Sequence, residues 1–138
     1  MKVVGLEHQC TITVRSYELD SYNHVNNAVY LNYLEFARME LLKSIKFDLN
    51  SLHRKGYAMI VAKINIAYKK PAGLNDTLLI KTIPHKLGKT SGVFKQIITR
   101  GSTPICEAEV TWVLVDDKGR PSRIPAELEL GKIYSVEI

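Results

Sequence analysis

The stretch LDSYNHVNNAVYLNYLEFARMELL, residues Leu19–Leu42, carries the strongest structural signal in this sequence. Its second half has apolar residues at steps of three and four, the period of an amphipathic α-helix. This apolar stripe consists of Tyr30, Leu34, Ala37, Leu41 and Ile45. The first half is polar, with one Asp, one His and three Asn between Asp20 and Asn27. We therefore predict one long helix that is capped by Asn26 or Asn27 and ends near Ser44–Lys46.

Strands are predicted on both sides of this helix, because apolar and polar residues alternate there. One strand precedes it at Gln9–Arg15, and four follow it. The four are Met59–Tyr68, Thr77–Ile83, Ser91–Thr99 and Ile105–Val115.

Turns and polar segments separate the predicted strands. Pro84 and Gly88 are expected to end the third strand, and Asp48–Gly56 to be a polar link. In the tail we expect a helical turn near Ala126–Leu130 and an edge strand near Ile133–Val136.

This order of elements predicts an α+β fold. Short turns force neighbouring strands to be antiparallel, and one helix fits the concave face of a curled sheet better than its outer face. We expect a single domain over residues 1–138, with a curled antiparallel sheet of about five strands wrapped around one long central helix. Exposed sheet edges favour a dimer that joins two sheets edge to edge.

The composition is that of a globular protein, with 138 residues, 46% of them hydrophobic and 24% charged. No apolar run is long enough to span a membrane, and the N-terminal segment lacks the pattern of a signal peptide. A cytoplasmic location is therefore expected. The net charge of +5 suits an anionic partner, but the basic residues are too scattered to predict nucleic-acid binding. No Cys, His and Asp cluster has ligand spacing, so no metal and no cofactor are expected.

The polar run before the helix contains the parts that acyl transfer needs. The first N–H groups of a helix have no intrahelical partner and carry partial positive charge, so they can hold a developing oxyanion. The carboxylate of Asp20 could attack the carbonyl carbon or deprotonate a water molecule that does. From the spacing alone, however, ordinary loop and capping residues are the favoured interpretation.

The run from Asp20 to Arg38, DSYNHVNNAVYLNYLEFAR, closely resembles the signature of the hotdog-fold acyl thioesterases, in the 4-hydroxybenzoyl-CoA thioesterase-like branch. Its His-Val-Asn-Asn part is also similar to acyl-ACP thioesterases. Tyr68–Asp76 and Gly88–Ser91 look like two further family segments, so the resemblance extends over about 11–115. It implies the same curled sheet around one helix, and a homodimer or homotetramer with acyl-thioester sites between subunits.

The resemblance also implies catalytic roles. Asp20 falls on the family's catalytic carboxylate, and the backbone N–H of Asn27 on the group that polarises the thioester carbonyl. His24 matches a histidine that orients substrate or water in some branches. The acyl-ACP enzymes have an Asn where this sequence has Tyr22, which argues against an Asp/Asn/His triad of their kind.

Substrate-binding residues are expected as well. Lys86, Lys89 and Ser91 lie where family members meet the phosphates of coenzyme A, although a solvated turn explains them equally well. Lys69 and Lys70 are second-rank candidates for the same role. Tyr30 either lines the acyl pocket or simply packs in the core.

The resulting hypothesis is an acyl-CoA thioesterase, which hydrolyses an acyl thioester to a free acid and a thiol. Two alternatives remain open: an acyl-ACP thioesterase and a non-catalytic acyl-CoA-binding hotdog module. The sequence gives neither the acyl chain length nor the choice between aromatic and aliphatic acyl groups.

Overall fold

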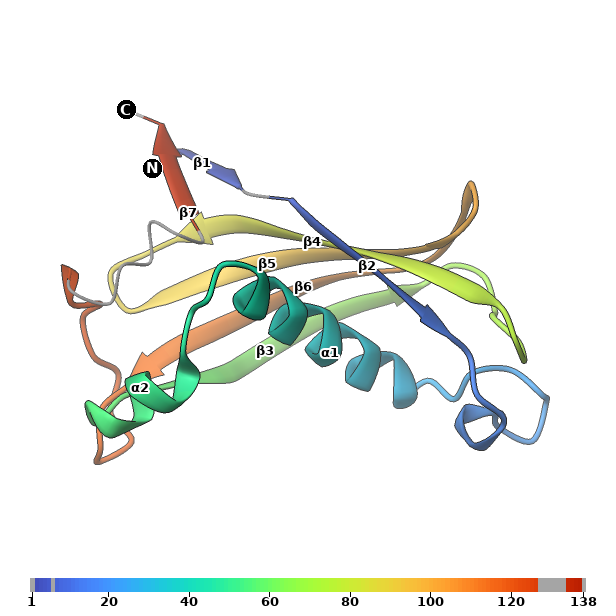
Figure 1. Cartoon of the computed structure of the whole chain (residues 1–138), viewed down its shortest axis with the longest axis horizontal. Helices are drawn as coiled ribbons and strands as arrows, with labels where there is room; N and C mark the ends of the chain where they lie inside the picture. The colour runs from blue at the N-terminus through green and yellow to red at the C-terminus, as the bar shows by residue number, and fades with distance from the viewer. Residues whose placement is uncertain (1, 6, 127–133, 138) are drawn as a thin grey trace.

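The computed structural model of the chain describes residues 2–5, 7–126 and 134–137. Five strands form one antiparallel sheet in the order β2-β4-β5-β6-β3. Their bounds are His8–Thr13 (β2), Ala58–Tyr68 (β3), Thr77–Leu87 (β4), Ser91–Arg100 (β5) and Thr103–Val115 (β6). The long helix α1, Val29–Ser44, lies across the concave face of this sheet (Figure 1). The predicted α+β architecture is therefore confirmed.

Two short elements and a strand pair complete the fold. They are a 3-10 turn η1 (Ser16–Glu18), the helix α2 (Leu49–Arg54), and β1 (Lys2–Gly5) paired with β7 (Tyr134–Glu137). β1 was not predicted, whereas β7 agrees with the expected edge strand in the tail. The helical turn expected near Ala126–Leu130 lies mostly outside the described residues.

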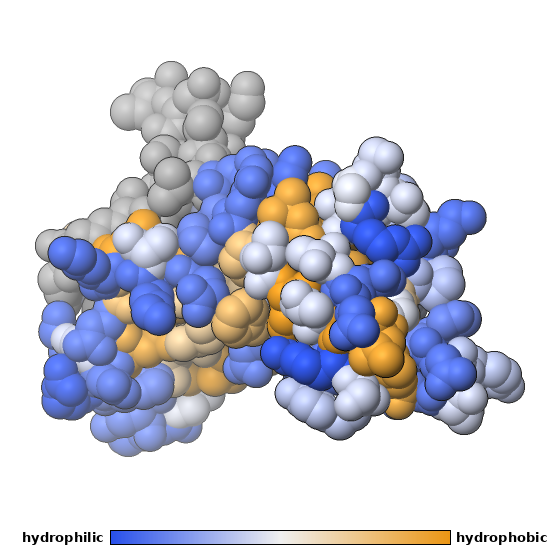
Figure 2. All heavy atoms as spheres, turned by 45° about the vertical axis from the view of Figure 1, so that its right-hand side comes forward, coloured by the Kyte–Doolittle hydropathy of each residue, from blue (hydrophilic) through white to orange (hydrophobic). Residues whose placement is uncertain are grey.

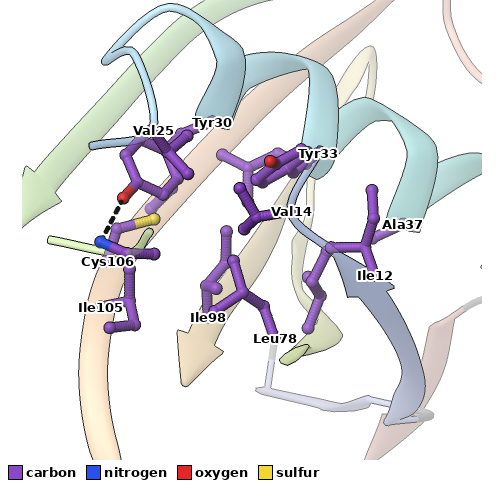
Figure 3. Packing of buried hydrophobic residues seen from close by; sticks show 14 residues of the cluster. Ile12, Val14, Val25, Tyr30, Tyr33, Ala37, Leu78, Ile98, Ile105 and Cys106 are labelled. Carbon is purple, nitrogen blue, oxygen red and sulfur yellow. Dashed lines mark hydrogen bonds between the residues drawn. The ribbon is translucent and has the colours of Figure 1, made fainter. Parts of the chain in front are cut away.

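The apolar stripe of α1 is buried as predicted. Tyr30, Leu34, Ala37 and Leu41 are each at most 4% exposed. The first three pack in one cluster with side chains of the sheet, in which Figure 3 labels Tyr30 and Ala37, and Leu41 belongs to a second cluster. Each buried Leu or Tyr side chain contributes about 1.5–3 kcal/mol through the hydrophobic effect. This packing fixes the start of α1 against the sheet.

The predicted helix cap is wrong, because neither Asn26 nor Asn27 holds the N-cap position. The helix begins at Val29, and Ala28, at the N-cap position, makes no side-chain cap. The Oδ1 atom of Asn26 instead accepts the N–H of Ala28 at 2.9 Å. The Asn26 side chain therefore accepts the N–H of Ala28, just before the helix. Asn27 lies in the turn between Asn26 and the first helical residue, Val29.

Two local predictions are wrong. The expected polar link at Asp48–Gly56 contains α2, because Asp48 caps this helix by accepting the N–H of Asn50 at 2.9 Å and Leu52 is buried. Pro84 lies inside β4 and does not end it, because the strand register shifts between Pro84 and Lys86 and accommodates the proline there.

Large hydrophobic side chains stay exposed on α1 and on the edge strand β3. Their exposed fractions lie between 38% and 48%, and they are Leu31, Phe36, Met39, Ile60, Val61 and Tyr68. Figure 2 shows hydrophobic surface between hydrophilic side chains on the face turned toward the viewer. Within the described part of the chain, no helix is both long and apolar enough to cross a membrane.

Candidate active site

The loop that precedes α1 is closed by hydrogen bonds of Asp20. The N–H of Asp20 donates to the carbonyl of His24 at 2.7 Å, and Leu19 and Val25 form an antiparallel bridge. The Oδ1 atom of Asp20 accepts the N–H groups of Tyr22 at 2.8 Å and His24 at 3.2 Å. Backbone and side-chain bonds thus hold one oxygen of the carboxylate in a fixed place.

A buried carboxylate beneath this loop anchors it to the helix. Glu18 is 6% exposed and accepts hydrogen bonds from the Arg15 backbone at 2.8 Å, the Arg15 guanidinium at 2.7 Å and the Tyr33 hydroxyl at 2.8 Å. Burial opposes ionisation of Glu18, but these bonds outweigh it and hold its pKa below the ordinary value. The carbonyl of Glu18 also accepts the N–H of Asn26 at 2.9 Å. The two ends of the loop are therefore tied together.

A second loop, after β3, packs against the first. The N–H of Val25 donates to the carbonyl of Ala72 at 2.9 Å, and the N–H of Ala72 donates to the Tyr30 hydroxyl at 3.3 Å, the bond drawn in Figure 3. The hydroxyl of Tyr68 donates to the carbonyl of Asn27 at 3.0 Å. This last bond fixes the peptide group that follows Asn27.

An ion pair supports this second loop. The Nη1 atom of Arg100 donates to the Oδ2 atom of Asp76 at 2.9 Å and to the carbonyl of Pro71 at 3.0 Å. The hydrogen bond from the N–H of Gly73 is the main reason that the pKa of Asp76 is lowered, and Arg100 adds to it. Asp76, part of a family-like segment in the sequence, thus has a structural role.

The two loops enclose a pocket of about 330 Å³. It brings together four of the predicted site residues, Asp20, His24, Asn27 and Tyr30. The backbone N–H of Asn27 makes no hydrogen bond to any described residue, so it can donate to a ligand. Tyr30 is only 4% exposed, so it both packs in the core and reaches the pocket.

Lys86, Lys89 and Ser91 do not reach this pocket within one chain. They lie at the hairpin between β4 and β5, at the opposite end of the sheet from the start of α1 (Figure 1). Their expected role at coenzyme A phosphates stays a prediction, and it requires the hairpin of another subunit.

Further residues line the pocket. Lys69 and Lys70, second-rank candidates from the sequence, contribute positive charge, and Val25, Tyr68 and Pro71 complete the wall. Tyr68 was missed as a site residue because the alternation of β3 predicts only a strand position. The neighbouring Lys-Lys-Pro turn was the available signal, since it marks where the strand ends.

The arrangement suits carbonyl chemistry. Asp20, which has a carboxylate, and Asn27, whose N–H has no partner among the described residues, line one pocket. A base or nucleophile and an oxyanion donor are the two elements that attack on a carbonyl carbon needs. Within the described residues no group of three His, Cys, Asp or Glu side chains forms a metal site.

Comparisons with known proteins agree with this geometry. The model of the thioesterase-like superfamily matches residues 14–130. The chain is 41% identical over 114 residues to the long-chain acyl-CoA thioesterase FadM of Escherichia coli, covering 80% of this chain and 84% of FadM. It is 34% identical over 127 residues to the chloroplastic acyl-acyl carrier protein thioesterase ATL2 of Arabidopsis thaliana, covering 91% of this chain and 68% of ATL2.

A solved structure shows the same fold. The crystal structure of YbaW, a probable thioesterase from Escherichia coli, superposes with a TM-score of 0.79 at 36% identity and covers 90% of this chain and 94% of YbaW. The family model, the relatives and the fold converge on one conclusion: the chain belongs to the thioesterase-like superfamily of hotdog thioester hydrolases.

Proposed function

We propose that this protein hydrolyses acyl-CoA thioesters, with Asp20 activating the attack and the Asn27 N–H receiving the oxyanion. One observation carries the proposal: Asp20 and Asn27, whose N–H has no partner among the described residues, line the same pocket. The name of the relative FadM, a long-chain acyl-CoA thioesterase, supports the substrate class. The hydrogen bonds of Asp20 Oδ1 support a fixed carboxylate whose Oδ2 atom is left without a protein partner among the described residues.

In the general-base route, the Asp20 carboxylate takes a proton from water while the water oxygen bonds to the thioester carbon. The carbonyl oxygen becomes an oxyanion and accepts the Asn27 N–H. The C–S bond then breaks, and the thiolate leaves and takes up the proton. A thiolate leaves readily, because its thiol has a pKa of about 8.5.

In the nucleophilic route, a carboxylate oxygen of Asp20 bonds to the thioester carbon and the thiolate leaves, which forms a mixed anhydride. Water then hydrolyses this anhydride and restores the carboxylate. Label entering Asp20 itself during single-turnover hydrolysis in ¹⁸O-labelled water would indicate the nucleophilic route, because it requires water to open an anhydride at the aspartyl carbon.

The thiol part of the substrate is either coenzyme A or acyl carrier protein. Lys69 and Lys70 at the pocket supply positive charge for the phosphates of coenzyme A. The relative ATL2 is named for acyl carrier protein substrates, and a net charge of +5 suits that acidic partner as well. His24, whose side chain lines the pocket, is proposed to orient the substrate or the water.

We further propose that two copies pair through β3, one of the two edge strands of the five-stranded sheet. Ile60 and Val61 project to opposite faces of this strand, and both are nearly half exposed. An edge strand with exposed apolar groups on both faces is a template for strand addition. Antiparallel pairing of two β3 strands would bury these side chains and place the two pockets near one interface.

A thiol-release assay on matched panels of acyl-CoA and acyl-ACP substrates tests the function. We expect turnover of acyl-CoA, with a dependence on chain length. Tight binding without thiol release for every acyl group and both carriers would overturn the proposal in favour of an acyl-binding module. Faster turnover of acyl-ACP at equal chain length would reassign the carrier.

A further inference from the structure

A second pocket lies between the C-terminal half of α1, the helix α2 and the sheet. It has a volume of about 210 Å³ and shares no residue with the Asp20 pocket. Its floor consists of four side chains that are at most 6% exposed, Leu42, Phe94, Val110 and Trp112. Met39 and Val61, which are 44% and 48% exposed, lie at its mouth. We call it the Trp112 pocket.

One wall of this apolar pocket carries a positive charge that the protein holds in place. The Nη1 atom of Arg38 donates to the Oε1 atom of Gln96 at 2.9 Å. Gln96 is completely buried, and its Nε2 atom donates to the carbonyl of Leu34 at 2.9 Å and to the hydroxyl of Thr82 at 3.0 Å. Both functional atoms of the Gln96 amide are satisfied, so its oxygen stays directed at Arg38.

Most of the donors of Arg38 have no protein acceptor. A guanidinium has five N–H groups, and Arg38 makes one hydrogen bond and no ion pair among the described residues. A hydrocarbon ligand that displaced water from these groups would leave them unpaired, which costs about 1–3 kcal/mol and more for a charged group. A ligand oxygen in that place removes the cost.

The charge balance favours a neutral oxygen. Glu35 lies on the same wall, one turn before Arg38. The attraction of a ligand carboxylate to Arg38 is opposed by repulsion from Glu35, and an ionic ligand must also lose its hydration in an apolar pocket. A hydroxyl, keto or ester oxygen accepts the hydrogen bond without that loss.

We propose that the Trp112 pocket binds an aliphatic acyl chain that carries a neutral oxygen, which accepts a hydrogen bond from Arg38. Leu42, Phe94, Val110 and Trp112 contact the chain. Arg38 then discriminates between oxygenated and plain chains, and Gln96 positions Arg38.

The identity of this chain as part of the substrate rests on the proposed function and the proposed dimer. When two β3 strands pair in antiparallel orientation, the part of one strand near Val61 lies close to the part of the other strand near Tyr68. In such a dimer the Trp112 pocket of one copy would lie toward the partner's Asp20 pocket, from which an acyl chain could enter.

Binding can be measured without turnover, because Trp112 is the only tryptophan of the chain. Its fluorescence is titrated with three ligands of equal chain length: 1-decanol, decanoate and decylamine. We expect saturable changes, with 1-decanol binding at least as tightly as decanoate and decylamine binding most weakly. No saturable change with any ligand would overturn the pocket. Decanoate binding tenfold tighter than 1-decanol, or decylamine binding as well as 1-decanol, would overturn the role of Arg38.

The double variant Arg38→Met/Gln96→Met tests the hydrogen bond, because it removes the guanidinium without leaving the Gln96 oxygen unpaired. The buried Thr82 hydroxyl loses its donor, which costs about 1–3 kcal/mol, so urea unfolding is measured first to show that the variant is folded. We expect about tenfold weaker binding of 1-decanol, the loss of one hydrogen bond to a charged group. Arg120→Met, at an exposed turn, is the matched control and should bind like wild type. Unchanged binding in the double variant would refute the proposal, even if acyl-CoA hydrolysis is established. Absence of hydrolysis with the expected binding pattern would refute only the proposed function.

Discussion

The buried carboxylate of Glu18 offers a direct test of how the active-site loop is held. In Glu18→Gln the side chain keeps its shape but loses its charge. An amide NH₂ group replaces one of the two carboxylate oxygens, and it cannot accept the hydrogen bonds that this oxygen accepted. Three hydrogen bonds, from the Arg15 backbone, the Arg15 side chain and Tyr33, are affected. Hydrogen bonds to charged groups contribute about 1.5–3 kcal/mol each, and these three share one acceptor group. We expect the free energy of unfolding at pH 7 to fall by about 2–4 kcal/mol.

The pH dependence distinguishes this charge effect from a packing effect. The pKa of Glu18 is lowered in the folded state, so its contribution is complete above the unfolded pKa, about 4.3. That contribution is lost as the pH falls through the folded pKa. The stability difference between wild type and Glu18→Gln, measured by urea unfolding, should therefore shrink below pH 4. Glu109→Gln, at an exposed position of β6, serves as control. Equal stability of Glu18→Gln and wild type at pH 7, or a difference that does not shrink as the pH is lowered below 4, would refute the reasoning.

Three further outcomes are expected. Gly92→Ala should lower the free energy of unfolding by about 1–3 kcal/mol in urea titrations, because a Cβ there would overlap the indole ring of Trp112. Tyr68→Phe removes the hydrogen bond to the Asn27 carbonyl and should lower kcat for thiol release more than it raises KM, since the oxyanion donor loses its support. Burial raises the pKa of Cys106 to about 12, so a thiol reagent at pH 8 should modify it only after denaturant unfolds the chain.

Much of the fold was predictable because its signals are periodic. The apolar stripe of α1 and the alternation of apolar and polar residues in the strands arise because each element buries one face. The order of the helix and the strands along the chain then restricts the fold to a few possible topologies. α2 was missed because a six-residue helix is too short to show a period, and its Asp48 cap looks like a polar linker. Pro84 was misread because a strand irregularity cannot be recognised without the paired strand.

The site was predictable only where its residues are close in sequence. Asp20, His24 and Asn27 fall in one short run, and the resemblance assigned their roles. Tyr68 joins them through a hydrogen bond across 41 positions, which no local pattern reports. The network of Arg38 and Gln96 likewise spans 58 positions and links a helix to the middle of the sheet. Such pairs become visible only when the chain is folded.

The central claim is that the Asp20 carboxylate performs chemistry, and two substitutions test it together. Asp20→Asn keeps an Oδ1 atom that can accept the N–H groups of Tyr22 and His24, whereas Asp20→Ala removes that acceptor. The decisive measurement is the rate of thiol release by folded Asp20→Asn, on the acyl-CoA that the wild type hydrolyses fastest. We predict a loss of about 100-fold or more, the scale of general-base catalysis, with little change in thermal stability. A rate equal to that of the wild type, with a loss only in Asp20→Ala, would show that Asp20 merely shapes the loop.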